Sequence, residues 1–274
     1  MKNNIILSIV TVVYNGENTI EKTINSVNNQ TYKNIEYIVV DGYSKDKTWD
    51  IILNNKSKIT KYLQIHDSGI YDAMNIASQY CSGKYIYYLN SGDILYDNKV
   101  ISDIVDFCIE NNLPDMVYGG IIHKNPIDGI DSIRTKNREF SLHDISKGKT
   151  INHQAIFIKR EVMNKIGAFD ISYRLSADYD IECKIFISPN YNIQYIDRLI
   201  IEFYGGGASS NLWAVYKEKR NIIKHHFGWY NAIMYSTTRG FTLIVINLLH
   251  FFNILNPLLK ITRYSENKNP IKQC

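Results

Sequence analysis

The sequence has little cysteine. Four cysteines occur in 274 residues, far apart and with no CxxC pair, which disfavours a zinc site and gives no disulfide framework. A chain of this length buries enough apolar surface to fold without disulfides or a structural metal. We therefore expect a protein of the reducing cytosol, and the cysteines are Cys81, Cys108, Cys183 and Cys274.

The sequence also lacks an export signal and a strong excess of charge. The apolar run at 5–13 is too short to span a bilayer and has no small-residue cleavage site, which favours a buried strand. A formal net charge of +4 is too small to indicate nucleic acid as a partner. No G-x-G-x-x-G follows the first predicted strand, which disfavours a Rossmann dehydrogenase.

Short apolar runs alternate with amphipathic segments through the first part of the chain. This pattern predicts strands at 5–13, 35–40, 62–65 and 84–89, and helices at 17–29, 46–55 and 71–81. Such alternation indicates βαβ units with right-handed crossovers. The pattern loosens between about 119 and 150, and an apolar run at 154–158 and a helix from Glu161 follow. We predict an α/β fold with a mostly parallel sheet flanked by helices.

The C-terminal part of the chain differs from the rest in composition. Aromatic and basic residues mix at 213–230, and 241–259 contains no Asp, Glu, Lys or Arg. Asparagines and one histidine interrupt the second stretch, which favours a helix lying in a membrane surface or packed on protein over a true span. We predict one domain at 1–210 and a helical, hydrophobic tail at 211–274 that contacts a membrane surface.

Polar residues follow three of the predicted strands. Because ligands bind beyond the carboxyl ends of strands in doubly wound sheets, these ends are candidate binding sites. Each one alone is better explained as a turn or a helix cap than as a binding site. The three segments are Thr11–Gly16, Asp41–Thr48 and Leu89–Asp93.

Together these segments resemble the inverting family-2 glycosyltransferases, which have the GT-A fold. Ser8–Asn15 matches the family's S-[IV]-[IV]-T-x-x-Y-N opening, and Asp41–Thr48 is similar to its V-D-D-G-S-x-D-x-T turn. Three further segments resemble a branch that makes bacterial surface polysaccharides, and the resemblance spans roughly 5–205. They are Gly69–Asn75, Asn152–Ala155 and Ser176–Asp180.

The resemblance implies an enzyme that transfers a hexosyl or N-acetylhexosaminyl group from a nucleoside diphosphate sugar to a glycan. The acceptor would be lipid-linked, and the enzyme would work at the inner face of the cytoplasmic membrane. In the nucleotide site it implies Thr11, Tyr14 and Asn15, with Asp41 accepting a hydrogen bond from the base. A carboxylate suits that task because it only accepts when ionised. The alternative for Asp41 is an Asx turn, and for Asp46 a helix cap is favoured.

The metal motif departs from the family pattern. Only Asp93 aligns with a carboxylate, because Asn90 and Gly92 replace acids. One carboxylate and the donor diphosphate can still hold Mg²⁺ or Mn²⁺, since such ions keep several waters. The resemblance further implies Asp178 as the general base, the second acid of an E-D pair whose first acid is lost. Asp180 is its competitor, and a helix over Asp178–Phe186 points the two in different directions.

Four more residues are candidates for contact with the donor or the acceptor. They are Asp72, Asn75, His153 and Gln154. Each has a structural alternative, a helix cap for Asp72 and a buried polar role for His153. The missing acids also leave open a non-catalytic subunit that binds a sugar nucleotide or assists assembly.

Overall fold

The computed structural model describes residues 6–124, 132–133, 139–204, 211–240 and 242. The chain forms two compact units. Unit 1 is Met1–Ala208 and unit 2 is Ser209–Cys274.

Unit 1 is built on a mixed sheet, whose nine strands are counted within the described residues. The spatial order is β3-β2-β1-β4-β8-β6-β9-β5, with β7 paired to β6. Strands β3, β2, β1 and β4 are parallel, whereas β8 runs antiparallel to both β4 and β6. The strands are β1 Leu7–Val13, β2 Ile35–Asp41, β3 Lys61–Gln64, β4 Tyr85–Tyr88, β5 Ile94–Leu95, β6 Met116–Lys124, β7 Ser132–Ile133, β8 Ile156–Lys159 and β9 Ile193–Tyr204. The predicted α/β class with a mixed sheet flanked by helices is confirmed, and parallel and antiparallel strand pairs occur in equal number within the described residues.

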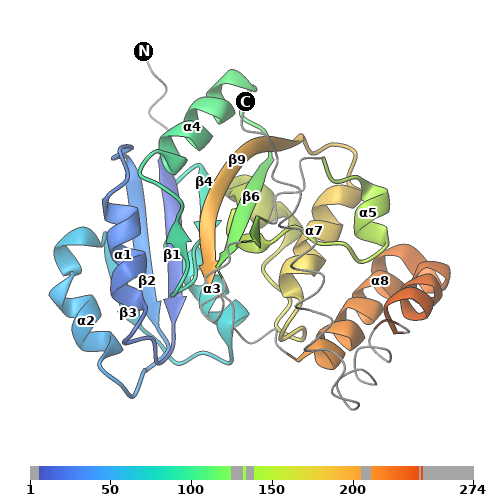
Figure 1. The fold of residues 1–274 in the computed structure, drawn as a ribbon, viewed down its shortest axis with the longest axis horizontal. Coiled ribbons are helices and arrows are strands. Elements are labelled where there is room, and N and C mark those ends of the chain that lie inside the picture. The colour runs from blue at the N-terminus through green and yellow to red at the C-terminus, as the bar shows by residue number, and fades with distance from the viewer. Residues whose placement is uncertain (1–5, 125–131, 134–138, 205–210, 241, 243–274) are drawn as a thin grey trace. The chain divides into compact units, whose positions relative to one another are not determined.

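Helices cover both faces of this sheet (Figure 1). One apolar core lies under α1, α2 and α4, and a second lies under α3, α6 and α7. The helices of unit 1 are α1 Ile20–Asn28, α2 Thr48–Asn54, α3 Ile70–Ser78, α4 Val100–Glu110, α5 Leu142–Ser146, α6 Arg160–Ile166 and α7 Ala177–Ile187, with short 3₁₀ turns η1 Lys56–Lys58 and η2 His153–Ala155.

Strand β1 shows why the near-continuous apolar run forms a central strand. All seven of its residues are buried, and Ile9 and Val10 face the two different cores. A strand covered on both faces needs apolar side chains at every position rather than at alternate ones. Its polar residues bond within the core, where the Ser8 hydroxyl donates to Glu36 Oε2 at 2.6 Å.

Strands β6 and β9 complete the sheet, and sequence patterning does not predict either as a long strand. The two run parallel, with register shifts around Gly119 and Gly120. A Cβ on Gly119 would lie 2.6 Å from the backbone oxygen of Arg198, so only glycine permits this approach. The irregularity obscures the alternation of side chains from which a strand is recognised.

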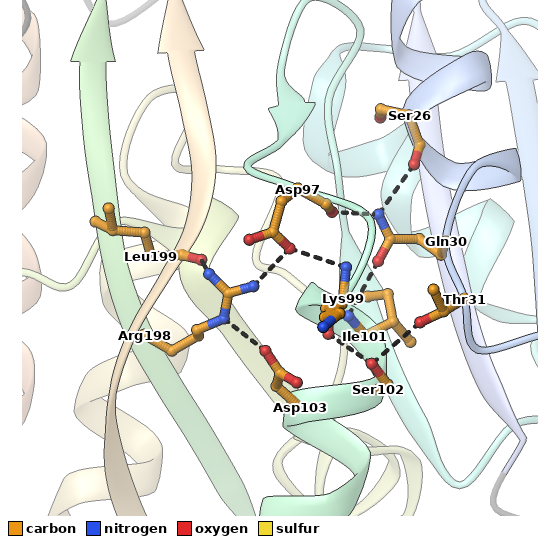
Figure 2. Close-up of polar contacts among 10 residues, drawn as sticks. All are labelled: Ser26, Gln30, Thr31, Asp97, Lys99, Ile101, Ser102, Asp103, Arg198 and Leu199. Atoms are coloured by element: carbon orange, nitrogen blue, oxygen red, sulfur yellow. Dashed lines mark hydrogen bonds and ion pairs between the residues drawn. The ribbon is translucent and has the colours of Figure 1, made fainter.

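A polar cluster connects β9 to α1 and to the start of α4 (Figure 2). We call this set Gln30, Asp97, Asp103 and Arg198 the Arg198 cluster. Arg198 donates to Asp97 Oδ1 at 2.6 Å and to Asp103 Oδ2 at 2.8 Å. The amide of Gln30 donates to the backbone oxygens of Ser26 and Asp97 and accepts from a backbone N–H at the start of α4. All of these contacts are structural.

Unit 2 contains the long helix α8, Leu212–Tyr235, followed by the π-helical turn η4, Ser236–Gly240. Gly228 has φ 82° and bends α8, a conformation that favours glycine. Among the residues that the structure describes, no helix combines the length and apolar character needed to cross a bilayer. The uncharged stretch 241–259 lies outside the described residues except for Thr242.

Candidate active site

The loops after β1 and β2 hold each other at one edge of the sheet. The backbone N–H of Asn15 donates to Ser44 Oγ at 2.8 Å, and Asn15 Oδ1 accepts from the Lys45 N–H at 2.8 Å. Tyr14, just before, keeps 62% of its surface exposed. Of the four predicted nucleotide residues, Tyr14 and Asn15 thus lie at a surface edge of the sheet.

Asp41 ends β2 and is fully buried. Its carboxylate accepts from the N–H and hydroxyl of Ser44 and from Gln64 Nε2 at 2.8 Å. These contacts match the Asx-turn alternative and fix the loop that carries Ser44. Recognition of the base by Asp41 stays a prediction.

A second carboxylate lies beside this loop. A Cβ on Gly42 would come within 2.7 Å of Asp67 Oδ2 and 3.6 Å of the Tyr14 ring, so Gly42 leaves room for both side chains. Burial raises the pKa of Asp67, and the nearby acids Asp72 and Asp41 raise it further. The aromatic ring of Tyr43 stacks on His66, with centroids 3.8 Å apart.

Three of the predicted residues make structural contacts. Thr11 is buried, and its hydroxyl donates to the Leu89 oxygen at 2.7 Å. Asp72 accepts from the N–H and hydroxyl of Ser68. The amide of Asn75 exchanges two hydrogen bonds of 2.9 Å with the backbone of Phe169. Each contact has a structural role, and direct contact with ligand stays a prediction for all three.

Asp93 is a second buried carboxylate among the predicted site residues, with 4% of its surface exposed. Burial raises its pKa to about 7, while His153 and a hydrogen bond from Gln154 oppose the shift. The neighbouring Asn90 Oδ1 is buried and has no hydrogen-bond partner among the described residues. The structure therefore brings Asp93, His153 and Gln154 close together, and the roles predicted for them stay predictions.

His153 connects the end of β4 to the start of α7. Its Nδ1 donates to Asp178 Oδ2 at 3.1 Å, and its Nε2 accepts from Asn90 Nδ2 at 3.0 Å. One neutral tautomer, with the proton on Nδ1, satisfies both contacts. The side chains of His153 and Asp178 are 21% and 19% exposed, so both are partly shielded from water.

Asp178 and Asp180 differ in their surroundings, as helical geometry requires. Asp178 begins α7 and accepts a hydrogen bond from the Tyr71 hydroxyl at 2.9 Å. Asp180 is buried and forms an ion pair of 2.8 Å with Lys184 on the same helix. Tyr71 belongs to the Gly69–Asn75 motif, which gave the only sequence signal for its role.

The segment that carries His153 is held from two sides. The Tyr87 hydroxyl donates to the Gln154 backbone oxygen at 2.7 Å. On the other side, the buried Glu182 accepts from the Thr150 hydroxyl at 2.8 Å and from the Ile151 N–H at 3.1 Å. Because Glu182 follows Asp178 by one turn, α7 positions both the carboxylate and the histidine that bonds it. Sequence analysis missed Glu182, which reads as an ordinary surface acid of a helix.

The residues present fit a divalent cation of the magnesium type. Asp93 supplies one carboxylate, and the unpartnered Oδ1 of Asn90 is a second hard oxygen close to it in the chain. Within the described residues, no group of three or more histidine, cysteine or acidic side chains could hold a metal ion. Such a partial ligand set suits an ion that shares its coordination with phosphate oxygens and water.

Comparison with known proteins agrees with this arrangement. The model of the family "Glycosyl transferase family 2" matches residues 8–167. A PGL/p-HBAD biosynthesis glycosyltransferase of Mycobacterium bovis is 29% identical over 207 residues, covering 74% of this chain and 78% of that protein.

Two solved structures are similar in fold. S. aureus TarS 1–349 in complex with UDP has a TM-score of 0.64 at 18% identity, covering 84% of this chain and 70% of that one. The chain spans only 38% of a longer TarS structure. The mannosyltransferase PcManGT from Pyrobaculum calidifontis, in complex with GDP-Man and Mn²⁺, has a TM-score of 0.58 at 15% identity, covering 81% and 62%. With the family model and the fold in agreement, this chain belongs to glycosyl transferase family 2 and is a glycosyltransferase with the GT-A fold.

Proposed function

We propose that the protein transfers one sugar, with inversion, from a nucleoside diphosphate sugar to a hydroxyl of a lipid-linked glycan. The observation that carries the proposal is the connected set Asn90, Asp93, His153 and Asp178, which we call the site network. His153 hydrogen-bonds both Asn90 and the carboxylate of Asp178, and it lies close enough to Asp93, the proposed cation ligand, to lower the pKa of that carboxyl. Similarity to proteins solved with UDP and with GDP-Man supports the donor class.

Asp178 is proposed as the general base. Its carboxylate would take the proton of the acceptor hydroxyl as that oxygen attacks the anomeric carbon, and the bond to the diphosphate breaks on the opposite side. The hydrogen bonds from Tyr71 and His153 hold the carboxylate in one orientation. A fixed orientation matters because a base must lie within hydrogen-bond reach of the proton it removes.

Asp93 and Asn90 are proposed to hold the Mg²⁺ or Mn²⁺ ion together with the donor diphosphate. When bound, the ion neutralises the negative charge that develops on the leaving diphosphate. Ionisation of Asp93 is costly in the buried site without a cation, so ion and donor should bind together.

Unit 2 is proposed to contact a membrane surface. Trp229 and Tyr230 are 59% and 73% exposed, and Lys224 Nζ lies 3.8 Å from the centroid of the Trp229 ring. Aromatic rings combined with basic side chains suit the headgroup region of an anionic bilayer. A Trp229→Ser/Tyr230→Ser variant should float less with vesicles containing anionic lipid than the parent. Equal flotation would contradict this part of the proposal.

The test of the enzymatic proposal is a screen of UDP-, GDP- and dTDP-sugars, each with and without Mn²⁺. We expect one nucleotide class to raise the melting temperature when Mn²⁺ is present, because a ligand that binds only the folded state stabilises it. Slow release of nucleoside diphosphate from the same donor should accompany binding. Stabilisation without any turnover, even with glycan acceptors, would favour a subunit that binds sugar nucleotides without catalysis.

A further inference from the structure

A cavity of about 200 Å³ lies in unit 1 outside the site network. Strands β6 and β9 supply one wall through Tyr118 and Tyr195, and the opposite wall comes from Phe140 and the segment Thr150–Asn152. The three aromatic rings lie close together, with centroids 5.5 Å apart for Tyr118 and Tyr195 and 6.2 Å apart for Tyr118 and Phe140. The cavity is smaller than the roughly 300–1,000 Å³ of drug-sized sites, a size that suits a single ring.

The side chains around this cavity indicate a neutral ligand with both polar and apolar surface. None of the side chains that line it is charged, which disfavours a phosphate or carboxylate as its occupant. Aromatic rings offer faces for the C–H groups of a sugar ring. Two polar groups accompany them, the Thr150 hydroxyl and the amide of Asn152, whereas the hydroxyl of the buried Tyr118 already accepts from the Phe140 N–H at 2.7 Å.

The amide of Asn152 lies where a ligand in the cavity could bond it. Asn152 immediately precedes η2, but its side chain does not cap that turn. The residue is exposed, so it lies where the cavity meets solvent. The Thr150 hydroxyl already donates to Glu182, and its oxygen lone pairs can still accept a hydrogen bond.

One residue that lines the cavity is adjacent in the sequence to a residue of the site network. Asn152 lines the cavity, and the next residue, His153, bonds Asp178 at 3.1 Å. On the sheet side, Tyr118 pairs with Ile156, which directly follows η2, and also with Tyr195 on β9. The cavity and the site network therefore share the segment Asn152–His153, and in the sheet β6 and β9 lie on the other side of β4 from β1 and β2.

We propose that this cavity binds a sugar ring of the acceptor, the one next to the ring whose hydroxyl is glycosylated. The proposal rests on the glycosyltransferase activity proposed above and adds the acceptor's chemical class, a glycan of at least two sugars. Binding of the neighbouring ring would position the reactive hydroxyl at Asp178. The favourable free energy of that contact would then orient the acceptor for attack. The residues proposed to determine specificity for the acceptor are Tyr118, Tyr195 and Asn152.

The test uses the full chain and ligand-observed saturation-transfer NMR. The probes are methyl glycosides of glucose, galactose, mannose and N-acetylglucosamine, each at millimolar concentration with UDP and Mn²⁺ present. We expect at least one glycoside to receive saturation from the parent protein. An Asn152→Trp variant, which fills the cavity mouth from an exposed position, should abolish that signal. Tyr62→Ala, which removes an exposed tyrosine from the edge strand β3, is the matched control and should keep it.

A second variant covers the case in which Asn152→Trp fails to fold. Tyr195→Ser removes one aromatic face, and it should weaken binding of the same glycoside by about three- to ten-fold. No saturation transfer to any of the four glycosides in the parent, or an undiminished signal in both cavity variants, would overturn the proposal. UDP, GDP and dTDP, each with Mn²⁺, are measured in parallel by thermal shift, and the one that stabilises the protein replaces UDP in the NMR sample. If one of them gives a shift, a missing glycoside signal counts against the cavity alone; if none does, the proposed function fails.

Discussion

The Arg198 cluster and the site network are both built from charged and amide side chains between strands and helices, yet they differ in how completely those groups are paired. In the Arg198 cluster, the guanidinium holds the pKa of Asp97 below its ordinary value, and the two carboxylates raise the pKa of Arg198. Every polar atom of the Gln30 amide has a partner there (Figure 2). In the site network, the Asn90 oxygen is unpartnered among the described residues and burial keeps the pKa of Asp93 near 7.

The difference separates groups that stabilise the fold from groups kept available for a ligand. A fully paired cluster stabilises the fold without a ligand. A buried carboxylate with a raised pKa instead lowers the stability of the fold at neutral pH. Such groups persist when a ligand supplies the missing partner, and perturbed carboxylates occur preferentially at functional sites. Substitutions in the two networks should therefore have opposite effects on activity and stability.

The largest effect is expected for Asp178→Asn. The amide keeps the shape of the side chain but cannot accept a proton, so transfer should slow by about 10²–10⁴-fold while donor binding is retained. Single-turnover transfer, measured after donor affinity is confirmed, checks this. Asp180→Asn is the matched control and should lower mainly stability, because Asp180 pairs with Lys184. Transfer by Asp178→Asn at close to the parent rate would remove Asp178 from its assigned role.

A second prediction concerns the stability of Asp93→Asn without metal. The folded-state pKa of Asp93 is about 7, above the roughly 3.9 of an unfolded chain, so the folded state binds this proton more tightly. Its contribution to stability is complete below about pH 4 and is lost as pH rises toward 7. Asn does not titrate, so the variant should gain up to about 4 kcal/mol over the parent between pH 4 and pH 8.

Urea unfolding of both proteins at several pH values measures this gain. Gln64→Ala is a useful comparison because it removes a hydrogen bond to Asp41 at the end of β3 and leaves Asp93 in place. A stability difference between parent and Asp93→Asn that does not change with pH would show that Asp93 titrates normally.

For the Arg198 cluster we predict the reverse pattern. Arg198→Ala removes two partly exposed ion pairs and the contact of the guanidinium with the Tyr96 ring. The free energy of unfolding should fall by about 1–2 kcal/mol, the scale of such surface contacts, with kcat and KM unchanged. Thermal or urea unfolding and steady-state kinetics are the measurements. A tenfold loss of kcat in the folded variant would mean that this cluster also serves the reaction.

The smallest expected effect is that of Tyr71→Phe. It removes one hydrogen bond to Asp178, worth about 0.5–1.5 kcal/mol, so kcat should fall by roughly two- to tenfold with the donor KM unchanged. The Phe169 contact of the ring remains, which limits any loss of stability. A fall in donor affinity instead of kcat would place Tyr71 in the donor site.

Sequence reasoning predicted the first half of the sheet because its strands are continuous apolar runs followed by motif loops. The resemblance of the sequence motifs to a known family also gave Asp93, His153 and Asp178 as candidate site residues, and their roles stay predictions. Sequence reasoning did not predict β6 and β9, whose pairing is irregular around Gly119. It also did not predict single hydrogen bonds between distant parts of the chain, such as Tyr71 to Asp178 or Ile151 to Glu182. Such bonds depend on distances in the folded protein that sequence spacing does not encode.

The most direct test of the contrast is calorimetric titration of UDP, in the presence of Mn²⁺, into the parent, Asp93→Asn and Arg198→Ala; GDP or dTDP replaces UDP if the screen selects it. We expect the parent and Arg198→Ala to bind the nucleotide with equal affinity. Only Asp93→Asn should lose the Mn²⁺-dependent part of nucleotide binding. Unchanged Mn²⁺-dependent affinity in Asp93→Asn would contradict the claim that the site network is where the donor and its metal ion bind.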